Sequence, residues 1–309
     1  MDLNSINEFL AAAIRMSAPL MIVGAGALFT ERTGVFNIGL EGTMLVGCMA
    51  AVYFSLQTGN LWLATLGAMF VGGLFGLVHA FLTITRRADQ IVAGAAINLF
   101  ALGITNLLNG PLYAGYEYRP RVTLYPVIAP EALQNLPILG PILFAQPVIV
   151  YFAFIIPILA TWILYRTTWG LAIRAVGDHP HAVATAGLSV YALKYIGVIT
   201  SGVFAGLGGA ALTLADLGLF APGMTNGRGF AVLAAFVVGK WNPILVAAAC
   251  ILFGSADALQ LRAQTIQLAI PYQVFVMLPY LLTIAALAGL VGRTVGPKTV
   301  GKPYDPESI

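Results

Sequence analysis

Charged residues are scarce in this chain. Only 9% of its 309 residues are Asp, Glu, Lys or Arg and 59% are hydrophobic, whereas a soluble domain carries about a quarter charged residues. This scarcity excludes a water-soluble enzyme. Five long runs contain no charged residue. Each of them could hold at least one membrane span, which needs about 20 apolar residues, and none alternates apolar and polar residues as a barrel strand would. The sequence therefore predicts an all-α, polytopic membrane protein. The runs are 42–85, 90–116, 132–165, 195–215 and 263–292.

Cysteine and catalytic motifs are also lacking. The two cysteines, Cys48 and Cys250, lie in apolar runs without CxxC spacing, which is typical of packing residues. The three histidines form no HExxH pattern, and no GxSxG elbow is present. Gly239-Lys240 is followed by Trp241, where a P-loop requires Ser or Thr. We therefore expect no catalytic residues, metal or cofactor, and any ATP that drives the protein must be hydrolysed by a partner.

Hydropathy and helix breakers predict eight or nine spans within one transmembrane domain, 1–309. A further apolar piece, 229–239, is too short to cross a membrane alone unless it is joined to its neighbours or is re-entrant. With the N-terminus outside, Lys and Arg gather on the cytoplasmic side, as cytoplasmic loops require. This orientation makes 110–146 an external loop, and 167–194 and the C-terminus cytoplasmic. The eight longer spans are expected at 8–29, 38–57, 61–84, 91–109, 147–165, 195–215, 243–261 and 272–292.

Glycine is abundant, with 34 residues. Gly72-x-x-x-Gly76 and Gly202-x-x-x-Gly206 are small-xxx-small pairs that let helices approach closely. The segment 34–42 is different, because three glycines, an amide and a carboxylate interrupt a hydrophobic stretch over 17–57. Irregular backbone at membrane depth survives where it is buried in protein or lines a wet cavity. This segment is therefore the first candidate for a substrate path.

A second interruption lies in the other half of the chain. Residues 222–230, rich in glycine, precede the short apolar piece, and Gly239-Lys240-Trp241-Asn242-Pro243 ends it. Two glycine-interrupted segments in two halves are typical of transporters built from repeats. The two stretches share little sequence. The indication of a repeat therefore rests only on their placement in the two halves of the chain.

Five residues of the interrupted segments and the fourth span are candidates for the substrate path. Glu41, the acidic residue placed at membrane depth, could face the path or be stabilised at a helix N-terminus. Asn37 could bind a ligand or satisfy the freed backbone, and Asn98 could bind a ligand or a neighbouring helix. Phe36 and Phe230 could stack on a planar base or pack in the core.

The loop 167–194 predicts a short helix near 178–188, which could be a plain surface helix or could sit in a groove on another protein. Its signals are Asp178 or His179 at the N-cap, Pro180 in the first turn, Ala182 and Ala186 on a small-residue face, and Gly187 as the stop.

Three segments, 34–42, 174–187 and 227–243, resemble the permease subunits of bacterial ABC importers for ribose-type sugars and branched-chain amino acids. Within that group, 36–42 and 239–243 are most similar to the shorter of the two permeases in nucleoside (guanosine-type) uptake systems. The resemblance extends over about residues 10–292. The Asp-Leu-Ser type sequence of sugar permeases and the Asn-Phe-Ala-His type of amino-acid permeases are both absent from the first segment.

The resemblance implies an ABC importer permease fold and the import of nucleosides, purine nucleosides included, across the bacterial inner membrane by alternating access. It also implies a longer sister permease, a cytoplasmic ATPase with two nucleotide-binding domains, and an extracytoplasmic nucleoside-binding lipoprotein. The helix near 178–188 would be the coupling helix on the ATPase, and Asn37 and Glu41 would lie beside the path. Alternatives are a sugar or branched-chain amino acid permease of the same group, or an ion-coupled secondary transporter.

Overall fold

The computed structural model describes residues 3–134, 136, 139–265, 274, 277, 281, 284 and 296–306. Within these residues the chain forms eleven α-helices and three short π-helical segments, and no strand beyond an isolated bridge between Val127 and Pro147. The elements are α1 (Leu3–Arg32), α2 (Leu40–Thr58), α3 (Leu61–Ala80), η1 (Phe81–Thr85), α4 (Gln90–Leu112), α5 (Glu131–Gln134), η2 (Gly140–Phe144), α6 (Val148–Arg166), α7 (Thr168–Asp178), α8 (Pro180–Thr185), α9 (Val190–Leu212), η3 (Thr213–Leu217), α10 (Arg228–Val238) and α11 (Pro243–Thr265).

Seven of these segments are long and apolar enough to cross a membrane, which confirms the polytopic all-α prediction. They match the first seven spans expected from hydropathy, and the short piece 229–239 is the separate helix α10. The eighth expected span, 272–292, falls outside the described residues except for isolated positions. The seven are Ile6–Arg32, Leu40–Thr58, Leu61–Thr85, Gln90–Leu112, Val148–Arg166, Val190–Leu217 and Pro243–Arg262.

Polar side chains set where several helices begin. The Asn60 side chain accepts hydrogen bonds from the Trp62 and Leu63 amides at the start of α3. The Asp89 carboxylate does the same for the first turn of α4. Such N-caps satisfy amides that have no acceptor inside the helix, so these polar residues separate adjoining apolar runs into distinct spans.

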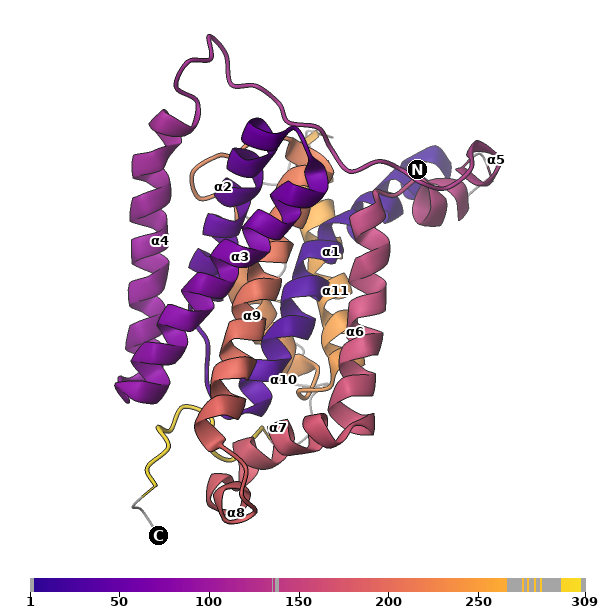
Figure 1. Cartoon of the computed structure of the whole chain (residues 1–309). Coiled ribbons are helices and arrows are strands. Elements are labelled where there is room, and N and C mark those ends of the chain that lie inside the picture. The colour runs from indigo at the N-terminus through magenta and orange to yellow at the C-terminus, as the bar shows by residue number, and fades with distance from the viewer. Residues whose placement is uncertain are drawn as a thin grey trace.

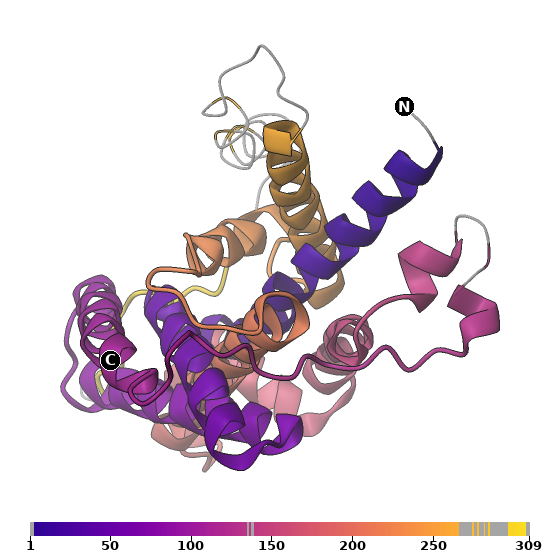
Figure 2. The same ribbon diagram turned by 90° about the horizontal axis from the view of Figure 1, so that it is seen from above.

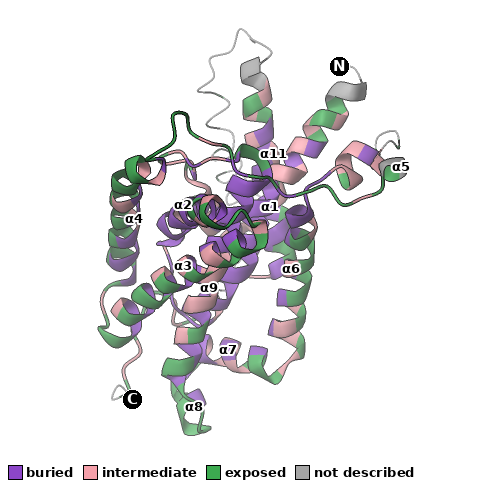
Figure 3. Cartoon of the chain, turned by 45° about the horizontal axis from the view of Figure 1, so that its top comes forward, coloured by how far each residue is buried: buried purple, intermediate pink, exposed green. Residues whose placement is uncertain are grey.

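The helices α1, α2 and α9 form the centre of the molecule (Figures 1 and 3). In their most apolar windows 67–78% of the residues are buried, against 28% for α3 and for α4. The outer helices therefore present broad apolar surfaces, as expected for spans that face lipid or another subunit.

One end of the bundle carries the segment that joins α4 to α6, and the other end carries α7 and α8 (Figure 1). Seen along the bundle, the joining segment crosses over the ends of the central helices (Figure 2). There the Val122 amide donates to the Gly218 carbonyl over 2.7 Å and the Tyr125 amide donates to the Leu214 carbonyl. Burial raises the pKa of Tyr125 to about 12, so this phenol stays neutral where it contacts Thr65.

The two small-xxx-small pairs predicted from the sequence form one interface, between α3 and α9. A Cβ added at Gly72 would overlap the Gly202 carbonyl, and one added at Gly202 would lie 2.8 Å from the Gly76 Cα. Gly206 is equally close to the backbone of α3 at Ala68. The absence of side chains thus lets two helix backbones touch, which gives van der Waals packing that apolar solvent cannot match.

We predict that Gly202→Ala lowers the free energy of unfolding by about 1–3 kcal/mol, because the new methyl group forces the two backbones apart. The matched control is Gly103→Ala on α4, where an added Cβ meets nothing within 4 Å. The midpoint of thermal unfolding in detergent measures both variants. Equal midpoints for the two variants would contradict the close packing of α3 on α9.

Candidate functional site

The first glycine-interrupted segment is a true break between two spans. The first long helix ends at Arg32 and the second begins at Leu40; we call residues 33–39 the broken segment. Gly34 has a φ of +78°, a conformation that glycine adopts without a steric penalty. The turn between the two helices therefore has backbone groups that no helix satisfies.

Side chains of α4 supply the missing partners. The Asn98 amide group donates to the Ile38 carbonyl over 3.0 Å, and its oxygen accepts from the Gly42 amide over 2.8 Å. Gln90, buried at the start of α4, accepts from the Phe36 amide over 2.6 Å. Since a buried backbone group without a hydrogen-bond partner destabilises the folded chain, these side chains of α4 stabilise the break.

Glu41 connects the two interrupted segments. Its two carboxylate oxygens accept hydrogen bonds from the amides of Gly227 and Gly229, over 2.8 and 2.7 Å. These amides form the start of α10, whose own N-cap residue is Gly227 and offers no side chain. A Cβ at Gly229 would lie 2.5 Å from the Glu41 Cα, so glycine allows the approach. A negative charge at a helix N-terminus is stabilised by the aligned peptide dipoles.

The remaining candidates have different surroundings. Asn37 is 2% exposed and its side-chain amide donates to the Ser201 hydroxyl of α9 over 2.8 Å. Phe36 is half-buried, whereas Phe230, in the first turn of α10, is 46% exposed. The structure thus brings Glu41, Asn98 and both interrupted segments together, places Asn37 against α9, and leaves the Phe230 ring largely uncovered by the described part of the chain.

The other group of predicted residues lies at the α7–α8 end of the bundle (Figure 1). Pro180 begins α8 and Gly187, with a φ of +82°, follows its end, as the sequence indicates. The helix is shorter than the expected 178–188, because it stops at Thr185. Ala182 and Ala186 are both exposed, so the small-residue face is open to a partner.

The N-cap of this helix is His179, one of the two residues expected from the sequence, whereas the other, Asp178, does not occupy that position. Asp178 is the last residue of α7, and its carboxylate accepts from the Lys298 amide over 3.3 Å. His179 occupies the N-cap position, but its side chain makes no capping hydrogen bond. The reason is tertiary, since the segment 296–306 supplies contacts for both side chains that the local sequence does not reveal.

A family model described as "Branched-chain amino acid transport system / permease component" matches residues 9–287. The chain belongs to this permease family.

Three relatives resemble the permease over most of their length. The guanosine ABC transporter permease protein NupQ of Bacillus subtilis is 40% identical over 305 residues, covering 95% of each chain. The putative glucose ABC transporter permease protein TsgC13 of Haloferax volcanii is 35% identical, covering 92% of each. NupP, a second guanosine ABC transporter permease protein of Bacillus subtilis, is 30% identical over 260 residues, 80% of this chain and 72% of its own.

Sequence reasoning missed two buried ionisable residues of the permease. Glu31 is 1% exposed and accepts from the Trp241 indole N–H over 3.1 Å. It also lies inside the stretch 17–57, so the criterion that selected Glu41 should have selected it, and treating Glu41 as that stretch's acidic residue was wrong. Lys194 is 2% exposed, and its ammonium donates to the Thr33 carbonyl over 2.8 Å. Its position at the end of a polar loop gave no signal of burial.

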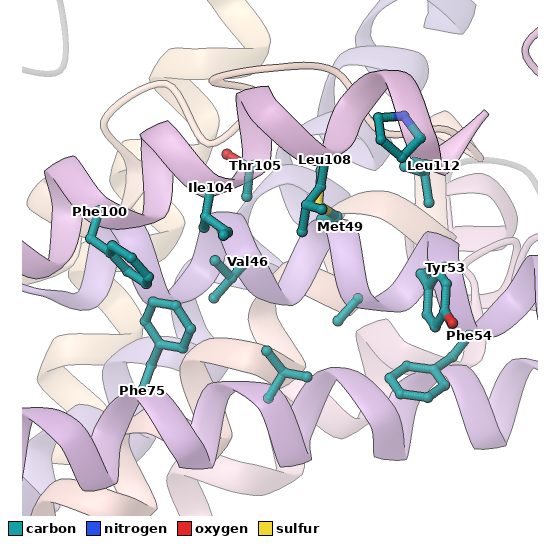
Figure 4. A pocket seen from close by; sticks show the side chains of 13 residues that line it. Val46, Met49, Tyr53, Phe54, Phe75, Phe100, Ile104, Thr105, Leu108 and Leu112 are labelled. Carbon is teal, nitrogen blue, oxygen red and sulfur yellow. The ribbon is translucent and has the colours of Figure 1, made fainter. Parts of the chain in front are cut away.

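A pocket of about 530 Å³ lies apart from these residues, between α2, α3 and α4 (Figure 4). The rings of Phe75 and Phe100 pack together at one end of it, with their centroids 6.0 Å apart, and the other walls are apolar except near Tyr53 and Thr105. Ligand sites combine apolar walls with convergent polar groups, so this pocket suits a hydrocarbon chain rather than a sugar or nucleoside. Among the described residues, no three His, Cys, Asp or Glu side chains gather as a metal site requires.

We predict that Glu41→Gln destabilises the permease by about 1.5–3 kcal/mol, because hydrogen bonds to a charged acceptor contribute roughly that much. The neutral amide offers one acceptor oxygen where the carboxylate offers two. Thermal unfolding in detergent and amide hydrogen exchange of residues 227–231 measure the effect.

The control for this variant is Glu8→Gln, which removes the same charge at an exposed position of α1. It should change stability by less than about 0.5 kcal/mol. If both variants retain the wild-type midpoint and exchange rates, Glu41 is not what holds the start of α10.

Proposed function

We propose that the permease is the shorter transmembrane subunit of an ATP-driven importer that moves purine nucleosides across the bacterial inner membrane by alternating access. The observation that carries the substrate class is the similarity to NupQ, 40% identical across 95% of both chains and named for guanosine. NupP, named for the same substrate, matches less of the chain at lower identity. The family match supports the transport role itself.

The substrate path in this proposal runs beside the junction that Glu41 makes between the two interrupted segments. Glu41 and Asn98 use their hydrogen-bonding atoms to bind backbone amides and a carbonyl. In this proposal they therefore shape the wall of the substrate path. Each interrupted segment supplies one aromatic ring, the half-buried Phe36 in the first and the exposed Phe230 in the second. Stacking on an aromatic ring is worth about 1–3 kcal/mol per base, which suits a nucleobase. Asn37 completes the wall from the side of α9.

The proposed importer contains three partners of this chain: a sister permease, an ATPase and a binding protein. A longer sister permease is supported by the pairing of NupQ with NupP and by the exposed apolar faces of α3 and α4. The similarity to ABC transporter permeases supports a separate ATPase with two nucleotide-binding domains as a further partner. A nucleoside-binding lipoprotein outside the membrane would deliver the substrate. In this arrangement α8 is the coupling helix that meets the ATPase.

The proposed orientation places the α7–α8 end in the cytoplasm, with the N-terminus of the chain outside and its C-terminus inside. The termini lie at opposite ends of the bundle (Figure 1). Arg86, Arg166 and Arg174 lie at or next to the α7–α8 end, and retention of Lys and Arg on the cytoplasmic side favours this choice.

A sugar is the second candidate substrate, because TsgC13, named for glucose, is 35% identical over 92% of both chains. Uptake by proteoliposomes separates the two candidates. We predict that the permease, reconstituted with its sister subunit, ATPase and binding protein, accumulates labelled guanosine when ATP is present. Excess adenosine should compete and excess glucose should not.

The control for transport is the same vesicle with this chain alone, under a proton or sodium gradient. Guanosine uptake in that control would contradict an ATP-driven importer and indicate an ion-coupled carrier. Glucose uptake by the full complex, without guanosine uptake, would favour the sugar permease.

We further predict that Ala186→Glu lowers ATP-dependent guanosine uptake at least tenfold without reducing membrane insertion. A charged side chain on the small-residue face must lose its hydration in the groove of a partner, which costs several kcal/mol. Ala114→Glu is the matched control, because Ala114 is also exposed but lies at the opposite end of the bundle. Equal uptake by the two variants would remove α8 from the coupling contact.

A further inference from the structure

Residues 296–306, which we call the C-terminal segment, run along the α7–α8 end of the bundle (yellow in Figure 1). The segment has no helix or strand of its own. It nevertheless contacts α7, α8, α9 and the turn between η1 and α4, so it connects elements that are far apart in sequence.

Thr299 fixes the segment to the end of α7. Its amide donates to the Gly177 carbonyl over 3.0 Å, and its hydroxyl donates to the same oxygen over 2.6 Å. The last carbonyls of a helix have no partner inside it, so Thr299 satisfies a group that α7 leaves free. The Lys298 amide contacts the neighbouring Asp178 carboxylate.

Tyr304 fixes the segment to α8 and α9. Its ring lies 5.3 Å from the His181 ring of α8 and 5.7 Å from the Tyr191 ring at the start of α9, the second pair in an edge-on arrangement. Next to it, Asp305 forms an ion pair with Arg87 over 3.2 Å. A helix of six residues has little stability alone, and in α8 only Pro180 and Val183 are buried. The Tyr304 ring is therefore a substantial part of what holds α8 in place.

The contact at Gly177 also reaches the broken segment. A Cβ at Gly177 would overlap the Arg32 carbonyl and lie 3.2 Å from the Gly34 amide nitrogen. A Cβ at Gly34 would overlap the Thr299 hydroxyl and lie 3.3 Å from the Gly177 Cα. Gly177, at the end of α7, and Gly34, at the start of the broken segment, thus meet at backbone distance, and the Thr299 hydroxyl lies against both.

From this geometry we propose that Thr299 and Tyr304 are positioning residues for transport, because they hold α8 and the start of the broken segment as one mechanical unit. When the ATPase moves α8, the Gly177–Gly34 contact passes the movement to residues 33–39 and so to the path. This inference rests on the proposed function, since it takes α8 as the coupling helix.

Two matched pairs of variants test the proposal in the complete importer. Thr299→Val removes the hydroxyl, while Thr299→Ser keeps it. Tyr304→Ala removes the ring, while Tyr304→Phe keeps it. We expect Thr299→Val and Tyr304→Ala to lower the number of guanosine molecules moved per ATP hydrolysed by about fivefold, the change that the loss of one net hydrogen bond at Thr299 or of an aromatic pair at Tyr304 produces. ATP hydrolysis itself should stay near the wild-type rate, and the conservative variants should restore the ratio.

A second readout does not depend on the substrate. Amide hydrogen exchange of the purified chain should rise about fivefold in both 33–39 and 177–188 for Thr299→Val, and return toward wild type for Thr299→Ser. A merely local role would raise exchange near Gly177 and leave 33–39 unchanged.

The outcomes separate the two proposals. If the wild-type complex couples ATP to guanosine uptake and all four variants keep its ratio, the positioning role is overturned while the proposed function stands. If the wild-type complex moves no guanosine but Thr299→Val loosens 33–39 together with 177–188, the proposed function fails and the mechanical unit stands. Unchanged exchange in both Thr299→Val and Tyr304→Ala overturns the unit directly.

Discussion

The hydrogen bonds from Gly227 and Gly229 to the Glu41 carboxylate are the contact on which the rest of this structure depends. They join residues that are 186 and 188 positions apart in the chain. The first amides of a helix have no acceptor inside it, so those of α10 need one from elsewhere in the protein. One carboxylate supplies it for two amides and gains from the helix dipole in return. A short helix that could not cross the membrane alone is thereby held beside the first break.

The central helix α9 carries both the rigid and the polar contacts of this arrangement. On one side Gly202 and Gly206 let the backbone of α3 approach it directly. Elsewhere on the same helix, the Ser201 hydroxyl accepts a hydrogen bond from Asn37 of the broken segment. The Lys194 ammonium donates one to the carbonyl of Thr33, at the start of that segment. Because close glycine packing fixes α9 against its neighbours, these polar contacts position the broken segment against a rigid support. The same helix therefore links the packing of the bundle to the geometry of the path.

The α7–α8 end differs from the core in how it is held. The described bundle relies on long helices, whereas α8 is short and is held by Thr299, Tyr304 and the glycine contact between Gly177 and Gly34. An element with few buried contacts opens locally at a low free-energy cost, so it can move without unfolding the bundle. In the proposed mechanism, the contact of Gly177, at the end of the adjoining α7, with Gly34 would carry that movement to the broken segment.

The sequence by itself determined the membrane-spanning helices, the position of both breaks, and the placing of α8 between Pro180 and Gly187, because each depends on neighbours along the chain. Hydropathy over 20 residues and a glycine or proline at one position are local properties. Only the tertiary structure decided that Glu41 binds Gly227 and Gly229, that Asn98 satisfies Ile38 and Gly42, and that Asp178 contacts Lys298 instead of capping α8. It also decided that Glu31 and Lys194 are buried. Hydrogen-bond partners are selected by distance in space, and a residue's local sequence does not specify a partner more than a hundred positions away.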